Sequence, residues 1–503
     1  MEASKTIQQR TKNSAAIRGN LRLTAWLKGL TIALICVSFI SFFSFNYFFL
    51  FGNITRFGDA VFTLLRWLML AGLIVIPSAV FLKTNKFNTA IKWLLVLVPL
   101  ISLAWISRYL NLENIPANQT QEIFSSLNNF MPIALVGILF VTEALLMASI
   151  AVLFWVRDWK IQPNPSIQSP RPQPSPPQSQ TLATLFKQEF TKSKTKQLLF
   201  FLPVFLIAMP LNLFDNFVRL FSPNVFAFFE FRNFSVWHVL VFLGVFVCTY
   251  FAYRFLKTKS SDTRHKYLCV LALSLLVQYM NRASVLIGDG YNIYYTILAF
   301  IPLFICTIGA PVAAAAVFSK NRTLNNLAFF VHAGGALSVF FYFGRDGLSN
   351  FGTIFSYSFL YFIVMHGLLF AVCCLPTLLG EHKFTLKDTV VPMVYYACVI
   401  VVAAVVSEVI TLVTLDLFYD SFGAAGVIFP NFAFTQISPI AHNVPPVYIN
   451  IFGLTFDILY LPILFSVYVA IFWAFYGLYL LLTQKLAKDF FKVNELEFCC
   501  KND

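Results

Sequence analysis

Charged residues are scarce in this chain: only 12% of its 503 residues are Asp, Glu, Lys or Arg, while 58% are hydrophobic. Soluble domains average about 25% charged and about 45–50% apolar residues. A soluble fold cannot hide this excess, whereas a membrane protein presents it to lipid. The composition therefore predicts an all-α polytopic membrane protein. The formal net charge of +14 does not indicate a nucleic-acid partner, because basic residues lie mainly in the gaps between apolar segments.

Several catalytic and ligand-binding motifs are also missing. There is no G-x-x-x-x-G-K and no H-E-x-x-H, which argues against an ATPase or a zinc protease. None of the nine cysteines occurs in a C-x-x-C or Cys/His ligand spacing. We therefore expect no disulfide framework, no metal and no cofactor. The apolar run after the basic first 28 residues is too long for a cleaved signal, so it reads as a first membrane span.

Apolar runs of about 20 residues, the length that crosses a bilayer as a helix, recur along the chain. They predict twelve transmembrane helices: Leu30–Phe51, Ala60–Leu82, Phe87–Tyr109, Phe130–Val156, Gln197–Phe214, Ser235–Tyr253, Tyr267–Gly288, Tyr294–Phe318, Leu324–Phe343, Thr353–Leu379, Thr389–Leu415 and Phe452–Leu482.

The basic residues orient these spans. With the N-terminus in the cytoplasm, every lysine falls on the cytoplasmic side, as the positive-inside rule requires. Only arginines lie elsewhere: Arg56, Arg66, Arg108, Arg219, Arg232, Arg282 and Arg345. This distribution predicts cytoplasmic N- and C-termini in a bacterial cytoplasmic membrane.

A stretch rich in Pro, Ser and Gln divides the chain between the fourth and fifth spans. It cannot form a core and reads as an extended cytoplasmic linker, either a plain spacer or a docking segment for a protein partner. The predicted parts are a four-helix membrane part (1–156), the linker (157–196), an eight-helix bundle (197–483) and a cytoplasmic tail (484–503). Two outer segments, Asn111–Asn129 and Asp416–Ile451, could be a lid or simple connectors.

Polar side chains inside the predicted spans mark the candidate site, because such groups are costly in hydrocarbon. Counting about 1.5 Å per helical residue places Cys306, His332 and His366 near mid-membrane. Arg282, Arg345, Asp346, Glu408 and Asp457 lie closer to the outer surface. The pattern predicts an outward-facing polar funnel with a Cys/His floor, its charged residues binding substrate.

Each residue also has a structural interpretation. A membrane cysteine is often an apolar filler, and an intramembrane histidine often joins two helices. Arg282 could pair with Glu408 or Asp457, and Arg66 with Glu143, simply to hold helices together. Gly334 and Gly335 favour close helix packing, or a hinge.

Three functions are compatible with these residues. A thiol deprotonated by a histidine can carry an acyl group, so the first is acyl transfer on a membrane lipid. There, Cys306 is the nucleophile, His366 or His332 the base, and Arg282 orients an anionic headgroup. A polar outward cavity would equally serve a permease for a small-molecule solute. The third is a non-catalytic membrane scaffold.

Short motifs in the second half resemble the YwaF-type integral membrane proteins of bacteria, which are related to an animal transmembrane lipid acyltransferase. They are I-P-L-F-I-C (301–306), S-K-N-R-T-L-N-N (319–326), H-A-G-G-A-L (332–337), F-L-Y-F-I-V-M-H-G (359–367) and N-F-A-F-T-Q-I-S-P (431–439). The resemblance covers roughly residues 236–482 and implies a membrane helix bundle. Such families more often read L-P-L-H-L-C, so Phe304 stands where they have a histidine.

Overall fold

The fold is described from a computed structural model of the 503-residue chain. It describes the backbone of residues 2–42, 57–109, 133–161, 192–208, 235–288, 301, 303–338, 357–422 and 447–481. Side chains are described for 21–42, 64–103, 137–157, 193–208, 235–281, 301, 303–338, 361–416 and 447–481. The predictions for Asn111–Asn129, most of the Pro-rich linker and the tail lie outside these residues.

The described chain is mostly helical, and eight of its helices are long and apolar enough to cross a membrane. These spans are Leu21–Phe42, Leu64–Phe81, Asn85–Leu103, Gly137–Arg157, Val236–Lys257, Tyr361–Leu378, Leu386–Asp416 and Tyr460–Leu480. They match the composition-based prediction of a multi-pass membrane protein. The finer count of twelve stays a prediction. Hydroxyls within the helices are satisfied locally: Thr249 and Ser274, for example, each donate to the carbonyl four residues earlier.

Two compact units divide the chain. Unit 1 comprises residues 1–230, 261–300 and 353–364, and unit 2 comprises 231–260, 301–352 and 365–503. The predicted division after the linker stays a prediction, and the structure groups the helices differently, because Ser261–Gly288 clusters with the first helices.

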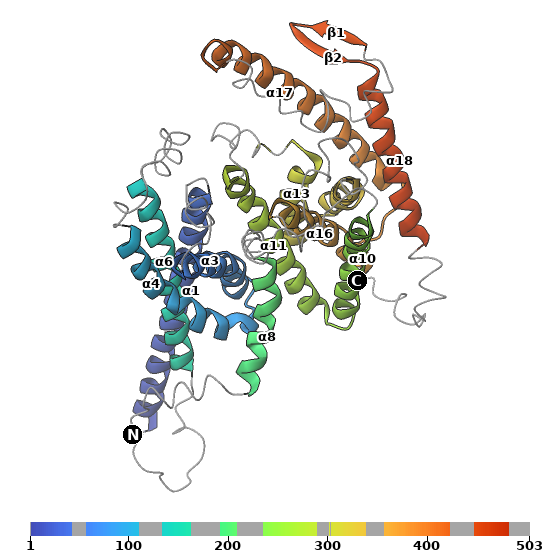
Figure 1. Ribbon diagram of the computed structural model, residues 1–503. Coiled ribbons are helices and arrows are strands. Elements are labelled where there is room, and N and C mark those ends of the chain that lie inside the picture. The colour runs from blue at the N-terminus through green and yellow to red at the C-terminus, as the bar shows by residue number, and fades with distance from the viewer. Residues whose placement is uncertain are drawn as a thin grey trace. The chain divides into compact units, whose positions relative to one another are not determined.

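Unit 1 is a set of packed helices in which α1, α3, α4 and α6 contact one another and α8 packs on α3 and α4 (Figure 1). Its elements are α1 (Glu2–Phe42), α3 (Phe57–Phe81), η1 (Asn85–Phe87), α4 (Asn88–Tyr109), α6 (Ile133–Ile161), α8 (Lys192–Ile207) and α11 (Ser261–Gly288). Helix α6 continues past the predicted end at Val156, and α8 begins before Gln197. The linker prediction 157–196 is therefore too long at both ends.

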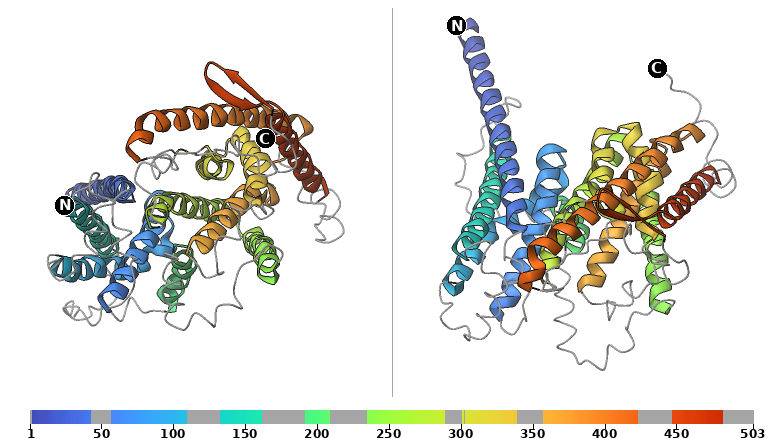
Figure 2. Two further views of the ribbon diagram at one scale, coloured as in Figure 1. Left: turned by 45° about the horizontal axis from the view of Figure 1, so that its top comes forward. Right: turned by 90° about the horizontal axis from the view of Figure 1, so that it is seen from above.

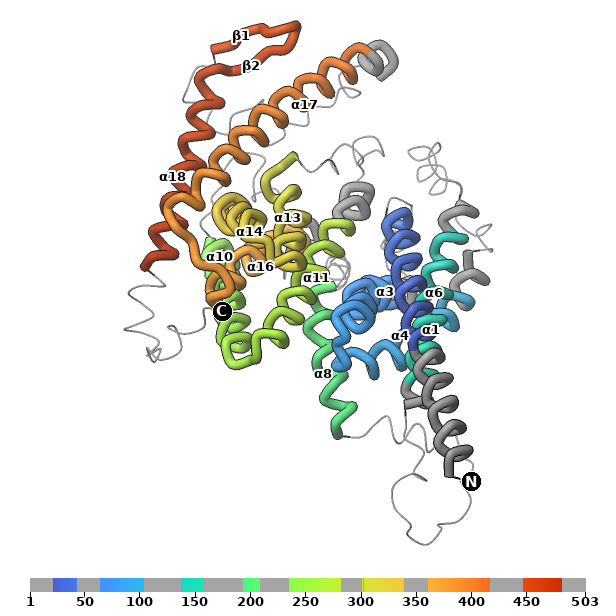
Figure 3. The backbone as a smooth tube through the Cα atoms, turned by 180° about the vertical axis from the view of Figure 1, so that it is seen from behind, coloured from blue at the N-terminus to red at the C-terminus, as the bar shows by residue number. Residues whose placement is uncertain are grey.

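Unit 2 contains shorter and interrupted elements (Figure 3). They are α10 (Val236–Lys257), α13 (Ile305–Ser319), α14 (Arg322–Leu327), η5 (Ala328–His332), α15 (Ala333–Ser338), α16 (Tyr357–Leu378), η8 (Leu386–Thr389), α17 (Val390–Phe422), β1 (Tyr448–Ile451), β2 (Leu454–Asp457) and α18 (Tyr460–Leu480). Helix α16 joins this unit from Met365 onward. Large apolar side chains on α10, such as Leu240, Leu243 and Phe251, are exposed. Exposed faces of this kind suit lipid.

A two-stranded antiparallel hairpin departs from the predicted all-α fold (Figure 2). Strands β1 and β2 pair from Tyr448 with Asp457 to Ile451 with Leu454, and Phe452 and Gly453 form the turn with φ of 52° and 82°. The Glu408 carboxylate on α17 accepts a hydrogen bond from the Thr455 N–H at 3.1 Å. That bond ties the hairpin to the helix that precedes it.

Candidate functional site

Cys306 lies at the start of a helix, rather than deep within the continuous span predicted for Tyr294–Phe318. The backbone of Phe304 is extended, with φ −80° and ψ 141°, and α13 begins at Ile305. The N–H groups of Thr307 and Ile308 both donate to the Phe304 carbonyl at 2.9 Å. Cys306 is thus the second residue of α13, at the positive end of the helix dipole, where a thiolate is favoured.

The helix that starts there has 15 residues, which is about 22 Å and shorter than the hydrocarbon core. Its first turn therefore lies within the membrane if its last turn is at the surface. Irregular backbone at that depth is tolerated only where protein buries it or where it lines a polar cavity. The interruption before Ile305 is consequently the feature around which a site can form.

The neighbouring segment is irregular too. Residues Ala328–His332 form a π-helical turn between α14 and α15. Such turns are rare and often occur at functional sites. The predicted span Leu324–Phe343 is helical over its described part, which ends at Ser338, and contains this π-helical turn.

His332, fully buried at the end of this turn, holds three elements together. Its Nδ1 lies 2.9 Å from the Ile305 carbonyl oxygen, so Nδ1 carries the proton and donates. Its Nε2 then accepts from the Tyr395 hydroxyl of α17 at 3.4 Å. Both ring nitrogens are engaged, which makes His332 a positioning residue for the first turn of α13. The interhelical interpretation of this histidine is the one the geometry supports.

Glycines allow this close approach. A Cβ on Gly335 would lie 2.5 Å from Ile305 Cγ2, and one on Gly334 would lie 2.9 Å from Ile471 Cγ2. A Cβ on Gly309 would lie 3.0 Å from the imidazole Nδ1 of His332. The packing interpretation of the paired glycines is confirmed, because any side chain there would push α15 away from α13 and α18.

A tyrosine hydroxyl lies near Cys306. The half-buried thiol is within electrostatic range of the Tyr468 phenol on α18, whose oxygen lies 3.5 Å from Ser338 Oγ. The ring of Tyr396 packs on that of Tyr468, with centroids 4.5 Å apart. Within the described residues the buried Tyr396 hydroxyl has no hydrogen-bond partner. A buried hydroxyl in this state costs about 1–3 kcal/mol.

Sequence reasoning missed these hydroxyls. The signal that could have found them is the pair Tyr395–Tyr396 within an otherwise aliphatic helix, together with Ser338 close after the paired glycines.

The structure describes the side chains of some of the other predicted site residues but not of all of them. His366 is buried on α16, beside Gly367, which faces Val245 of α10. The Asp457 carboxylate caps α18 by accepting from the N–H groups of Leu459 and Tyr460, each at 3.1 Å. Glu408 supports the hairpin, so the hydrogen bonds of both carboxylates are structural. The side chains of Arg282, Arg345 and Asp346 lie outside the described residues, and the substrate-binding funnel stays a prediction.

The predicted pairing of Arg66 with Glu143 is confirmed in unit 1. Arg66 Nη1 lies 3.1 Å from Glu143 Oε2, and the two side chains are 3% and 0% exposed. Ser41 Oγ donates to the same carboxylate oxygen at 3.1 Å, and the guanidinium lies over the Phe42 ring at 5.0 Å. This ion pair joins α1, α3 and α6.

Among the described side chains, no three His, Cys, Asp or Glu residues are grouped as metal ligands. Comparison with models of protein families, with curated proteins and with solved structures finds no match for the chain.

Proposed function

We propose that unit 2 transfers acyl groups to a membrane lipid, with Cys306 as the thiol that carries the acyl group. The observation that supports this most is the position of Cys306 in the first turn of the short helix α13, near the phenol of Tyr468, which is itself close to Ser338. The positive helix end favours the thiolate, and nearby donors can stabilise the oxyanion of an acyl-transfer intermediate.

The chemistry would proceed in two steps. The Cys306 thiolate attacks the carbonyl carbon of an acyl donor, and the donor's leaving group departs with the electron pair of the broken bond. A lipid hydroxyl or amine then attacks the resulting thioester, loses its proton to a base and releases the thiolate. We assign the base to His366, because both ring nitrogens of His332 are already hydrogen-bonded.

The proposal includes a location. We place the chain in the cytoplasmic membrane of a bacterium, with twelve crossings and both ends in the cytoplasm. The eight long apolar helices and the distribution of lysines support this arrangement. Protease protection of tags at residues 162–180 and at the C-terminus in inverted vesicles tests it; protected tags would contradict it.

An acylation assay tests the chemistry. Purified full-length protein in nanodiscs receives a labelled acyl thioester, and labelled lipid is measured by chromatography. We expect Cys306→Ser to abolish the product. Cys398→Ser, which changes an exposed cysteine on α17, should leave it unchanged. Full product formation by the Cys306 variant would reject the mechanism.

A permease is the second candidate, and one observation favours it. Transporters often bind anionic substrates at the N-terminal ends of interrupted helices near mid-membrane, and α13 begins in that way. An uptake assay with the same purified protein, reconstituted in liposomes, distinguishes the two functions. Uptake of labelled organic anions that survives Cys306→Ala, without any acylated lipid, would favour transport.

A further inference from the structure

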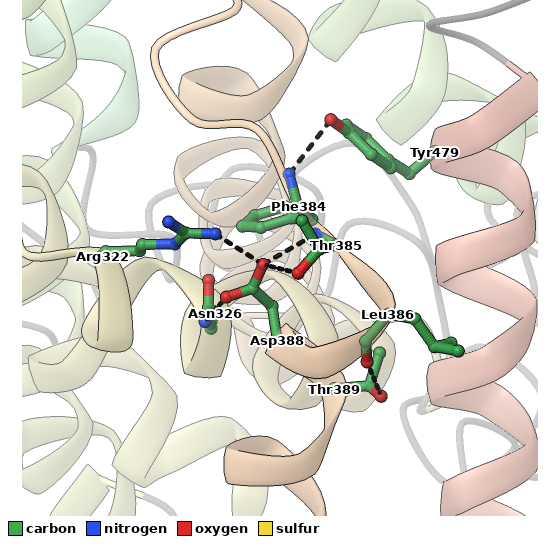
Figure 4. Close-up of polar contacts among 8 residues, drawn as sticks. All are labelled: Arg322, Asn326, Phe384, Thr385, Leu386, Asp388, Thr389 and Tyr479. Atoms are coloured by element: carbon green, nitrogen blue, oxygen red, sulfur yellow. Dashed lines mark hydrogen bonds and ion pairs between the residues drawn. The ribbon is translucent and has the colours of Figure 1, made fainter.

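A polar network closes the end of unit 2 opposite the hairpin. Asp388, on the short helix η8, accepts four hydrogen bonds (Figure 4). One carboxylate oxygen accepts from Arg322 Nη2 at 2.8 Å, and from the N–H and Oγ1 of Thr385 at 2.7 and 2.8 Å. The other accepts from Asn326 Nδ2 at 3.2 Å. The carboxylate is saturated, and it fastens the start of α14 to the segment before α17.

This network positions Arg322 but engages only one nitrogen of its guanidinium. Its side chain is 60% exposed and uses a single nitrogen to reach Asp388. A guanidinium has five N–H donors in a planar fork, so most of them point away from the carboxylate. An arginine held in this way is preorganised for an external oxyanion, above all a phosphate, which accepts two parallel hydrogen bonds.

More cations gather at the same place. Lys320 caps the C-terminal end of α13, Lys383 lies in the turn before η8, and Lys387 lies on η8 itself. We call these three lysines and Arg322 the cationic rim. His382 lies in the same turn as Lys383; burial lowers the pKa of its imidazole, and the positive charges of Arg322 and Lys320 lower it further. The acidic residues on the same segments are Glu381 and Asp388, so positive charge is in excess.

Exposed apolar side chains flank the rim. Phe318 is 42% exposed at the end of α13, Leu386 is 50% exposed on η8, and Val390 is 56% exposed at the start of α17. A ligand bound here would meet cations on one side and an oily surface on the other. That combination fits an amphiphile better than a free anion.

We propose that the cationic rim binds the phosphate of an anionic phospholipid in the cytoplasmic leaflet, with the acyl chains against Phe318, Leu386 and Val390. The leaflet follows from the lysine distribution, which assigns the segments containing Lys320 and Lys383 to the cytoplasm. Binding at this rim does not depend on acyl transfer by Cys306.

Native mass spectrometry of the purified full-length protein tests the site, with equal amounts of phosphatidylglycerol and phosphatidylcholine as probes. We expect the wild type to retain phosphatidylglycerol in preference. Lys320→Gln with Arg322→Gln should weaken that binding roughly thirtyfold, since each cation near a membrane surface contributes about 1 kcal/mol and about 1.4 kcal/mol corresponds to a factor of ten. Lys266→Gln is the matched control, because Lys266 is a solvent-exposed lysine paired with Asp262 in unit 1.

A second variant keeps the Asp388 network intact. Lys320→Gln with Lys387→Gln removes two charges without touching a hydrogen bond of Asp388, and we expect a loss of similar size. Unchanged binding in this variant, or an equal loss in the Lys266 control, would overturn the site. Displacement of the lipid by an excess of inorganic phosphate would show that the ligand is a free anion, and would overturn its lipid identity.

Discussion

The buried pair of Arg66 and Glu143 makes the sharpest stability prediction. Glu143→Gln keeps the shape of the side chain but leaves the guanidinium of Arg66, 3% exposed, without a counter-charge. Ser41 also loses its charged acceptor. Removing one partner of a buried ion pair costs about 3–5 kcal/mol, because the other charge stays buried and uncompensated. We expect Arg66→Gln to cost a similar amount.

Replacing both residues distinguishes the loss of the ion pair from the loss of side-chain packing. Arg66→Met with Glu143→Leu removes both charges and leaves apolar groups of similar volume, which is often neutral or stabilising. Thermal unfolding of the full chain in detergent, followed by size-exclusion chromatography, measures the result. At roughly 2–4 °C per kcal/mol, each single variant should lower the Tm by about 6–20 °C. The double variant should lie within a few degrees of the wild type. Single losses below about 1 kcal/mol, or a double loss equal to their sum, would refute the reasoning.

Three further predictions concern unit 2. Gly335→Ala should destabilise the protein and suppress acyl transfer, since the added Cβ would lie 2.5 Å from a side-chain carbon of Ile305. Gly477→Ala on α18 is the control: its Cβ meets nothing within 4 Å, so this variant should be neutral or stabilising by about 1 kcal/mol in the same Tm assay. The lowered pKa of His382 means that the fold favours the neutral imidazole, so the stability of the protein is full above about pH 6.5 and falls as His382 becomes protonated at lower pH. His382→Asn should therefore reduce the drop in Tm between about pH 7.5 and 5.5. An equal drop in the variant and the wild type would contradict this role of His382. Phe452 has a φ of 52°, a backbone conformation that suits glycine or asparagine. Phe452→Asn should therefore raise the Tm by about 1–3 °C. A lower Tm would show that the exposed phenyl ring has a packing role.

Hydrophobic patterning was sufficient to predict the membrane class and several contacts. A run of apolar residues long enough to cross a bilayer has few alternatives to a helix, because lipid offers no partner to the backbone. For the same reason an arginine and a glutamate in two such runs are expected to meet, as Arg66 and Glu143 do. Paired glycines likewise predict close packing, and Gly334 and Gly335 show it.

The site itself depends on features that hydropathy does not report. The start of α13 at Ile305 leaves the surrounding run just as apolar, and only Pro302, a residue typical of helix beginnings, signals it. The π-helical turn at Ala328–His332 has no distinctive amino-acid composition that would predict it. The bond between Arg322 and Asp388 joins residues 66 positions apart, so it follows from packing rather than from local pattern.

The hairpin shows a further limit. Phe452–Asp457 is uncharged up to its last residue, so it is absorbed into the predicted final span Phe452–Leu482, whereas Tyr448–Ile451 belongs to the predicted outer segment Asp416–Ile451. The turn at Phe452–Gly453 has the backbone conformation of a tight hairpin, although its sequence lacks the usual Asn-Gly. The hydrogen bond from Thr455 to Glu408 completes it, and that contact depends on the tertiary structure.

The central claim, that Cys306 carries an acyl group, is tested most directly by trapping the thioester. Purified protein is incubated with an acyl thioester donor, quenched in acid, digested and analysed by peptide mass spectrometry. We expect one acyl group on the peptide that contains Cys306, released by neutral hydroxylamine and absent from Cys306→Ser. An acyl group found on other cysteines to the same extent, or an unmodified Cys306 while labelled lipid is still produced, would contradict it.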